Sequence, residues 1–109
     1  MDWFKVMANL AQAQKWDDLS DGAARALVNI WCYVTRHDPE HGHVPPTIAR
    51  LVPRVTPARV SELERMGWLD RNGSGWVIHD WQEHQREAVA YERRKAKDRE
   101  RKRKPKEEE

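Results

Sequence analysis

The chain has 109 residues, 35% of them charged, and a mean hydropathy of −1.00, which excludes several large-cored domains and predicts one small domain with appendages. Its net charge of +2 conceals a split: residues 1–92 sum to −3, residues 93–106 to +8 and the last three glutamates to −3. The single cysteine excludes an internal disulfide, and the lack of an apolar run of about 18 residues or of a signal peptide argues against membrane insertion and secretion, so we expect a soluble, cytoplasmic protein.

The first third of the chain predicts a short extended segment followed by one long helix. The run from Trp3 to Val6 is apolar and β-prone, and we expect it to add to a small sheet. Residues 7–15 fit either a short helix or a turn. Ser20 is a good N-cap for a helix that ends near Arg36 and His37, where cations complement the helix dipole. Its expected apolar stripe consists of Ala24, Leu27, Val28, Trp31 and Val34.

The connection at residues 37–43 holds three histidines and two carboxylates, a composition that invites a metal site. Proline and glycine within it, and its position between two elements, favour a polar loop instead. The spacing matches no zinc motif. We therefore predict a loop, with no metal and no cofactor.

Residues 46–67 predict two short helices separated by a tight turn. Pro46 suits the start of a helix, and Pro53 ends that helix because it disfavours α geometry in the residue before it. Thr56 is a good N-cap for the second helix, residues 57–66, and Gly67 is a good terminator. The core-facing side of the second helix is expected to carry Val60, Leu63 and Met66.

Residues 68–71 and 76–79 are rich in aromatic and β-branched residues, and the four residues between them favour a turn. This pattern predicts a β-hairpin, and residues 43–44 predict a short strand that pairs with it. Two helices, a turn and a hairpin in this order are typical of a winged helix-turn-helix, in which the hairpin tip is the wing. The alternative is an ordinary structural hairpin that contacts no partner.

The helix at residues 57–66 and the hairpin tip are the first candidate surface for nucleic acid. Arginines can reach phosphates or guanine edges, whereas a glutamate on that surface repels the phosphate backbone. The residues expected to face outward or to flank the turn are Arg50, Arg54, Thr56, Arg59, Ser61, Glu62, Arg65, Arg71, Asn72 and Ser74. The alternative is a solvated helix face with internal charge pairs.

The basic end of the chain is the second candidate surface. It is composed of good helix formers but has no apolar face, so we expect a helix that frays when free. Its cations are Arg93, Arg94, Lys95, Lys97, Arg99, Arg101, Lys102, Arg103 and Lys104. Such a segment indicates a polyanion, which can be DNA, RNA or an acidic protein face, and a mere solubility tail stays open. A membrane fits poorly because the segment lacks an apolar face.

The chain resembles a known family through WFKV, LSDGAARALVNIWCYVTRH, GHVP, ERMGWLD and GWVIHDWQEHQ, followed by the Arg/Lys-rich helix. It is similar to the winged-helix domains at the N-termini of bacteriophage replisome-organiser or replication-initiation proteins, and to small helix-turn-helix proteins of actinobacteriophages. The resemblance covers roughly residues 1–104. It implies a winged helix that binds DNA through residues 57–66 and the wing, without enzymatic activity. Replisome organisers usually continue into a helicase-loading domain, whereas this chain stops, which favours a stand-alone DNA-binding protein.

We therefore expect an α+β fold with a small antiparallel sheet: a winged-helix domain at residues 1–81, a charged helix or arm at 82–104 and an acidic end at 105–109. The expected function is non-enzymatic binding of double-stranded DNA in phage replication or transcription control, in the bacterial host cytoplasm near the nucleoid. The sequence holds no phosphate loop, nucleophile elbow or nuclease carboxylate cluster. The alternatives are a module that binds a host or replisome protein, and an RNA or single-strand binder; a homodimer stays open.

Overall fold

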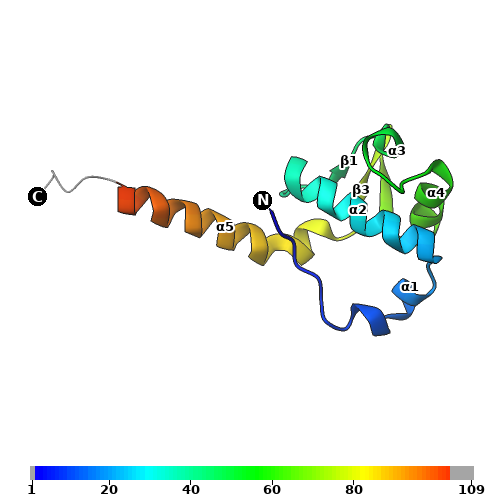
Figure 1. Ribbon diagram of the computed structural model, residues 1–109, viewed down its shortest axis with the longest axis horizontal. Coiled ribbons are helices and arrows are strands. Elements are labelled where there is room, and N and C mark those ends of the chain that lie inside the picture. The colour runs from blue at the N-terminus through cyan, green and yellow to red at the C-terminus, as the bar shows by residue number, and fades with distance from the viewer. Residues whose placement is uncertain (1, 104–109) are drawn as a thin grey trace, which may run out of the picture.

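The computed structural model describes residues 2–103, so Lys104 and the expected acidic end at 105–109 lie outside the described residues. The fold is α+β (Figure 1). In chain order the elements are the 3₁₀ helix η1 (Leu10–Gln12), α1 (Gln14–Asp17), α2 (Asp21–His37), β1 (His43–Val44), α3 (Ile48–Leu51), α4 (Pro57–Arg65), β2 (Leu69–Asn72), β3 (Gly75–Ile78) and α5 (Trp81–Arg103).

Helix α2 forms the centre of the domain, and its predicted start is confirmed. Ser20 is the N-cap, since its hydroxyl accepts a hydrogen bond from the Ala23 backbone N–H at 3.2 Å. The predicted stripe was wrong at its edges, because Val28 is exposed and Ala24 only half-buried. The buried face is rotated slightly from the predicted one. It consists of Ala23, Ala26, Leu27, Ile30, Trp31, Val34 and Thr35.

Helix α4 follows the proline and capping signals closely, whereas α3 follows them only in part. Helix α3 is shorter than expected and starts at Ile48, two residues after Pro46. Helix α4 begins with Pro57 directly after the N-cap Thr56, whose side chain accepts the Arg59 N–H. Val60 and Leu63 are buried, as predicted, and Gly67 has the positive φ of +81° that ends the helix.

The three strands form one antiparallel sheet in the order β1-β3-β2. The predicted pairing of residues 43–44 with the hairpin is confirmed, with Val44 opposite Trp76. The hairpin strands are shifted from the predicted ranges, and the turn has two residues rather than four, because Asn72 pairs directly with Gly75. Gly73, at φ +61°, is the first turn residue, the position that requires glycine in a type II′ hairpin.

The core lies where α2, α3, α4 and the sheet meet. Its fully buried side chains include Leu27, Ile30, Ile48, Leu63 and Leu69. Around it the tryptophan rings of residues 16, 31 and 68 pack against one another, with centroid separations of 6.0–6.3 Å. Three aromatic side chains, from α1, from α2 and from the residue before β2, therefore extend a core that the polar composition would otherwise leave small.

The expectation that residues 3–6 join the sheet was wrong, because the sheet of the described residues contains only β1, β2 and β3. This segment instead runs along the first turns of α5 (Figure 1). The buried Gln85 side chain forms the backbone hydrogen bonds that a neighbouring strand would form. Its Oε1 accepts the Lys5 N–H at 2.7 Å, and its Nε2 donates to the Lys5 carbonyl at 2.8 Å. One side chain thus satisfies the backbone groups that a sheet would have paired.

Helix α5 begins inside the core and ends far from it. Trp81, Gln85 and Ala88 are buried and hold its first turns to the domain, whereas residues 93–101 are all exposed. The helix projects outward and gives the molecule dimensions of 61 × 31 × 22 Å (Figure 1). None of the helices in residues 2–103 combines the length and the apolar character needed to cross a membrane.

Candidate nucleic-acid interface

The exposed face of α4 carries short side chains and one arginine. Ala58, Ser61 and Arg65 are exposed and lie at successive i, i+3 or i+4 positions, whereas Val60 and Leu63 face the core. A helix with such a face can approach another surface closely, because small side chains leave its backbone accessible. Arg65 supplies the only long cationic side chain on this face of α4.

Arg59 lies differently from the outward orientation predicted from sequence. Its guanidinium donates from Nη1 to the Arg54 carbonyl at 2.6 Å and packs over Gly22 at the start of α2. A Cβ atom at Gly22 would lie 2.6 Å from Arg59 Nε, so only glycine leaves room for this contact. Arg59 therefore joins α4 to α2 and to the turn, and it is a weaker candidate for DNA contact than Arg65.

Glu62 also departs from the expected outward orientation. Its carboxylate accepts hydrogen bonds from the Ser20 backbone N–H and from the Ser20 hydroxyl, both at 2.8 Å. These hydrogen bonds, the backbone one first, hold the pKa of the Glu62 carboxyl below its usual value, and the charge of Arg65 adds to the effect. The negative charge sits at the positive end of α2, where it is stabilised by the helix dipole.

Glu64 connects α4 to the hairpin. Its Oε1 lies 2.9 Å from Arg71 Nε and accepts the Trp76 indole N–H at 2.8 Å. The Arg71 guanidinium also lies 5.2 Å from the centre of the Trp76 ring, within cation–π range. Both glutamates of α4 thus bind groups of the same molecule, so the repulsion of phosphate expected from their sequence positions is reduced. Arg71 is correspondingly less available as a wing cation.

The remaining candidates of this surface are exposed and flank α4. Arg50 lies at the end of α3, and Arg54 sits in the turn with a positive φ of 69° while its carbonyl accepts Arg59. Thr56 is exposed but its hydroxyl caps α4. Asn72 and Ser74 are exposed at the hairpin tip. The structure therefore places most of the predicted first surface around one end of the domain.

The second surface is the distal half of α5. Arg93, Arg94, Lys95, Lys97, Arg99 and Arg101 are exposed, and Lys102 and Arg103 belong to the same helix. Among the cations at residues 93–101, two have partners: Arg93 pairs with Glu40, and Arg101 lies 2.9 Å from Asp98. Exposed pairs of this kind contribute little and can be exchanged for phosphate contacts.

The two surfaces lie at opposite ends of the long axis of the molecule (Figure 1). Helix α4 is at one end, and the distal half of α5 extends toward the other, along the 61 Å dimension. The sequence could not predict this separation, because it depends on the direction in which α5 leaves the core. Any ligand that contacts both surfaces at once must be extended.

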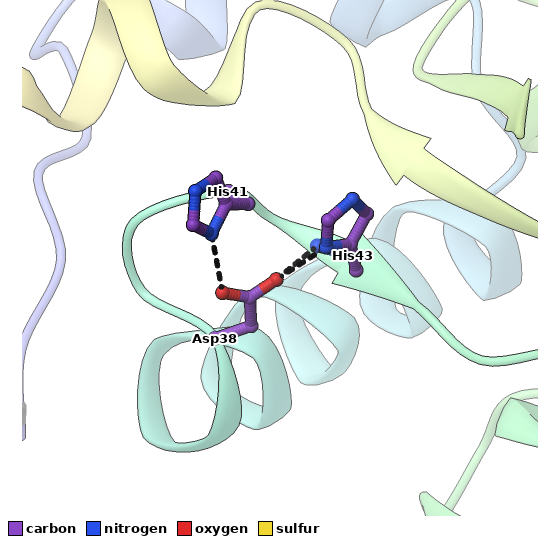
Figure 2. A group of neighbouring side chains, drawn as sticks. All are labelled: Asp38, His41 and His43. Carbon is purple, nitrogen blue, oxygen red and sulfur yellow. Dashed lines mark hydrogen bonds and ion pairs between the residues drawn. The ribbon is translucent and has the colours of Figure 1, made fainter.

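The loop at residues 37–43, predicted from the sequence to be polar and without metal, brings three of its side chains together. In the loop between α2 and β1, Asp38 accepts from His41 Nδ1 at 3.1 Å and from His43 Nδ1 at 2.7 Å (Figure 2). Partial burial raises the pKa of the Asp38 carboxyl, but the hydrogen bonds from His41 and His43 outweigh it, so the pKa is lowered overall. His37 does not join this group and stacks on Tyr33 instead. The spacing D-x-x-H-x-H is the sequence pattern that corresponds to this cluster.

The comparisons with known proteins identify no relative. No family model, no curated protein and no solved structure matches the chain. Function is therefore inferred from the two surfaces and from the order of the elements.

Proposed function

We propose that this protein is a winged helix that binds double-stranded DNA without catalysing a reaction. The observation that carries the proposal is the exposed face of α4, which is lined by short side chains and Arg65 and has both neighbouring glutamates bound elsewhere in the molecule. The element order and the β1-β3-β2 sheet are compatible with a winged helix. In that arrangement α4 is the helix that enters the major groove.

In the proposed complex, some contacts position the protein on the DNA and others supply most of the affinity. Helix α4 enters the groove, with Arg65 at a base edge or a phosphate, while Arg50 and Arg54 contact the backbone. Asn72 and Ser74 of the hairpin tip approach the adjacent minor groove. The cations of distal α5 neutralise further phosphates, which supplies most of the affinity because each released counterion contributes.

The separation of the two surfaces sets the length of DNA that this binding mode needs. At about 3.4 Å per base pair, the 61 Å dimension corresponds to about 18 base pairs of duplex. We expect duplexes much shorter than this to contact α4 or α5 but not both. The dependence of affinity on duplex length then measures whether the two surfaces act on one duplex.

The main test is the salt dependence of affinity in the full chain. We compare the native protein with a variant in which Lys95, Lys97, Arg99 and Arg101 are replaced by glutamine. The slope of log affinity against log salt should become shallower by about 3 to 4, because each phosphate contact contributes about 0.9. The control replaces Arg36 and Arg86, two basic residues outside both surfaces, with glutamine. Its slope of log affinity against log salt should stay close to that of the native protein. An unchanged slope in the α5 variant would contradict the role of α5.

A second test separates Arg65 from Arg59. The Arg65→Ala variant should relax sequence preference by about 1–3 kcal/mol if Arg65 contacts a base. The Arg59→Ala variant should instead lower the free energy of unfolding, because it removes the contacts with Arg54 and Gly22. Preference is measured by selection from a random duplex pool. If Arg65→Ala keeps the native preference, α4 does not read bases.

The resemblance to phage replication-initiation domains supports phage DNA replication or transcription control as the process served. One observation favours the rival function, binding of a host or replisome protein. Trp3, Val6 and Met7 are exposed apolar residues, and the last two border a cavity of about 540 Å³ beside the root of α5. Capture of a partner that survives nuclease treatment, together with no shift of duplex DNA in a gel, would support this rival.

A further inference from the structure

The loop between α2 and β1 brings three metal-binding groups together from a short stretch of chain. One oxygen or ring nitrogen from each of Asp38, His41 and His43 can be chosen so that all three lie within 4.8 Å of one another. Figure 2 shows the two imidazole rings next to each other, each directed toward a different oxygen of the same carboxylate. These are nitrogen and oxygen donors, the combination that suits zinc and its late first-row neighbours.

The separations within the cluster can be compared with those between ligands in a zinc site. In a tetrahedral zinc site with bonds of about 2.0–2.2 Å, neighbouring ligand atoms are about 3.3–3.6 Å apart. The contacts of 3.1 Å from Asp38 Oδ1 to His41 Nδ1 and of 2.7 Å from Asp38 Oδ2 to His43 Nδ1 are slightly shorter and use different oxygens, so an ion requires both rings to rotate away from the carboxylate. The two rings are 54% and 56% exposed, which gives an ion access from solvent and leaves a fourth position for water.

The backbone of the loop is also held by contacts that do not involve the three side chains. Gly42 has a φ of +74° and lies against the Trp81 ring, where a Cβ atom would come within 2.5 Å of Cγ. The Trp81 indole N–H donates to the Pro39 carbonyl at 2.8 Å. The Gly42 N–H donates to the Asp38 carbonyl, and the Gly42 carbonyl accepts the Ile78 N–H. The donors are therefore carried on a braced loop, which lowers the conformational cost of binding an ion.

We propose that Asp38, His41 and His43 form a binding site for a divalent late first-row metal ion, with zinc as the representative. On binding, each imidazole moves its Nδ1 proton to Nε2 or releases it, so that the Nδ1 lone pair faces the metal. The Asp38 carboxylate exchanges its two histidine hydrogen bonds for the ion. An ion here cross-links the end of α2 to the start of β1, next to the residues that hold the root of α5.

The alternative is that Asp38 only closes the loop, since its carboxylate also accepts the His43 backbone N–H at 3.2 Å. Both arrangements use the same residues, and they differ in what zinc does. A loop-closing cluster gains nothing from zinc, whereas a metal site takes up one ion per chain and depends on both rings. This site is independent of the DNA-binding proposal, so either can fail alone.

The test is calorimetric titration of the full chain with zinc. We expect one ion per chain, and a fall in affinity of at least about tenfold for His41→Ala and for His43→Ala, because even partners outside the ligand shell contribute about ten- to a hundredfold. His37→Ala and His84→Ala are the matched controls, since both residues are exposed histidines outside the cluster, and they should bind zinc like the native chain.

Two results would overturn the proposal. One is the lack of stoichiometric binding to the native chain, and the other is an equal loss of affinity in the control and cluster variants, which would mean scattered binding to surface histidines. X-ray absorption of the zinc-loaded native chain provides a measurement that does not depend on variant folding. Two imidazole nitrogens and a carboxylate oxygen on the ion support the site, and a shell without two imidazoles contradicts it.

Discussion

The charged residues of α4 and those of distal α5 have opposite roles. Around α4, Arg59, Glu62 and Glu64 each bind a partner within the molecule, and through these bonds the helix is held to α2, the turn and the hairpin. In distal α5 every residue from 93 to 101 is exposed, including six cations. The same residue types thus support the fold in one region and remain available to a ligand in the other.

This comparison explains why charge alone is a poor guide to the binding surface. The basic residues of the domain are partly engaged by internal partners, and the domain is mildly acidic overall, as the sum of −3 for residues 1–92 indicates. In the proposed binding mode, a phosphate backbone is attracted mainly by α5. The exposed face of α4 contributes shape and one arginine. We therefore expect substitutions of the internally bonded charges around α4 to lower the stability of the fold, and substitutions of the exposed cations in α5 to leave it nearly unchanged.

The largest effect on stability is expected at the root of α5. Trp81→Ala should lower the free energy of unfolding by about 3–5 kcal/mol, because it empties a buried site and leaves the Pro39 carbonyl without its donor. Urea denaturation measures this change. Tyr91→Ala, at a 50% exposed aromatic ten residues later on the same helix, should change it by less than about 1 kcal/mol. Equal losses at both positions would mean that α5 is packed along its whole length.

A smaller effect is expected where the N-terminal segment meets α5. Gln85→Ala removes both hydrogen bonds to the Lys5 backbone and should destabilise the fold by about 1–2 kcal/mol. Hydrogen exchange should report the local consequence, since the Lys5 amide loses its acceptor. Gln82→Ala, at an exposed position one turn earlier, is the control and should have no comparable effect. A protected Lys5 amide in Gln85→Ala would contradict this role.

The smallest effect concerns pH. The pKa of Glu62 is lowered in the folded protein, so its carboxylate stabilises the fold above the ordinary value near 4.5, and this contribution is lost as pH falls through the lowered pKa. Glu62→Gln should therefore flatten the loss of stability below about pH 5. Asp38 has a lowered pKa as well, so the variant should retain part of the slope. Identical acid profiles for the variant and the native chain would remove Glu62 from the pH dependence.

Local signals in the sequence predicted much of the fold. The caps Ser20 and Thr56, the terminator Gly67 and the strand at residues 43–44 lie where they were expected, because each acts through the backbone of its immediate neighbours. The hairpin was predicted but its turn was too long, since the choice between a two- and a four-residue turn depends on strand register.

Which groups each segment and each polar side chain contacts within the molecule was decided only by the tertiary structure. The sequence indicated that residues 3–6 are extended, but their place beside α5 depends on Gln85, which lies 80 positions from Lys5 in the chain. It also indicated which charges lie on α4, but not that Glu62 turns to Ser20 or that Asp38 gathers two histidines. Side-chain partners of this kind follow from how elements pack, because a long polar side chain bonds to whichever group the packing brings within reach. Sequence therefore determined the elements, and packing determined which of their charges stay free for a ligand.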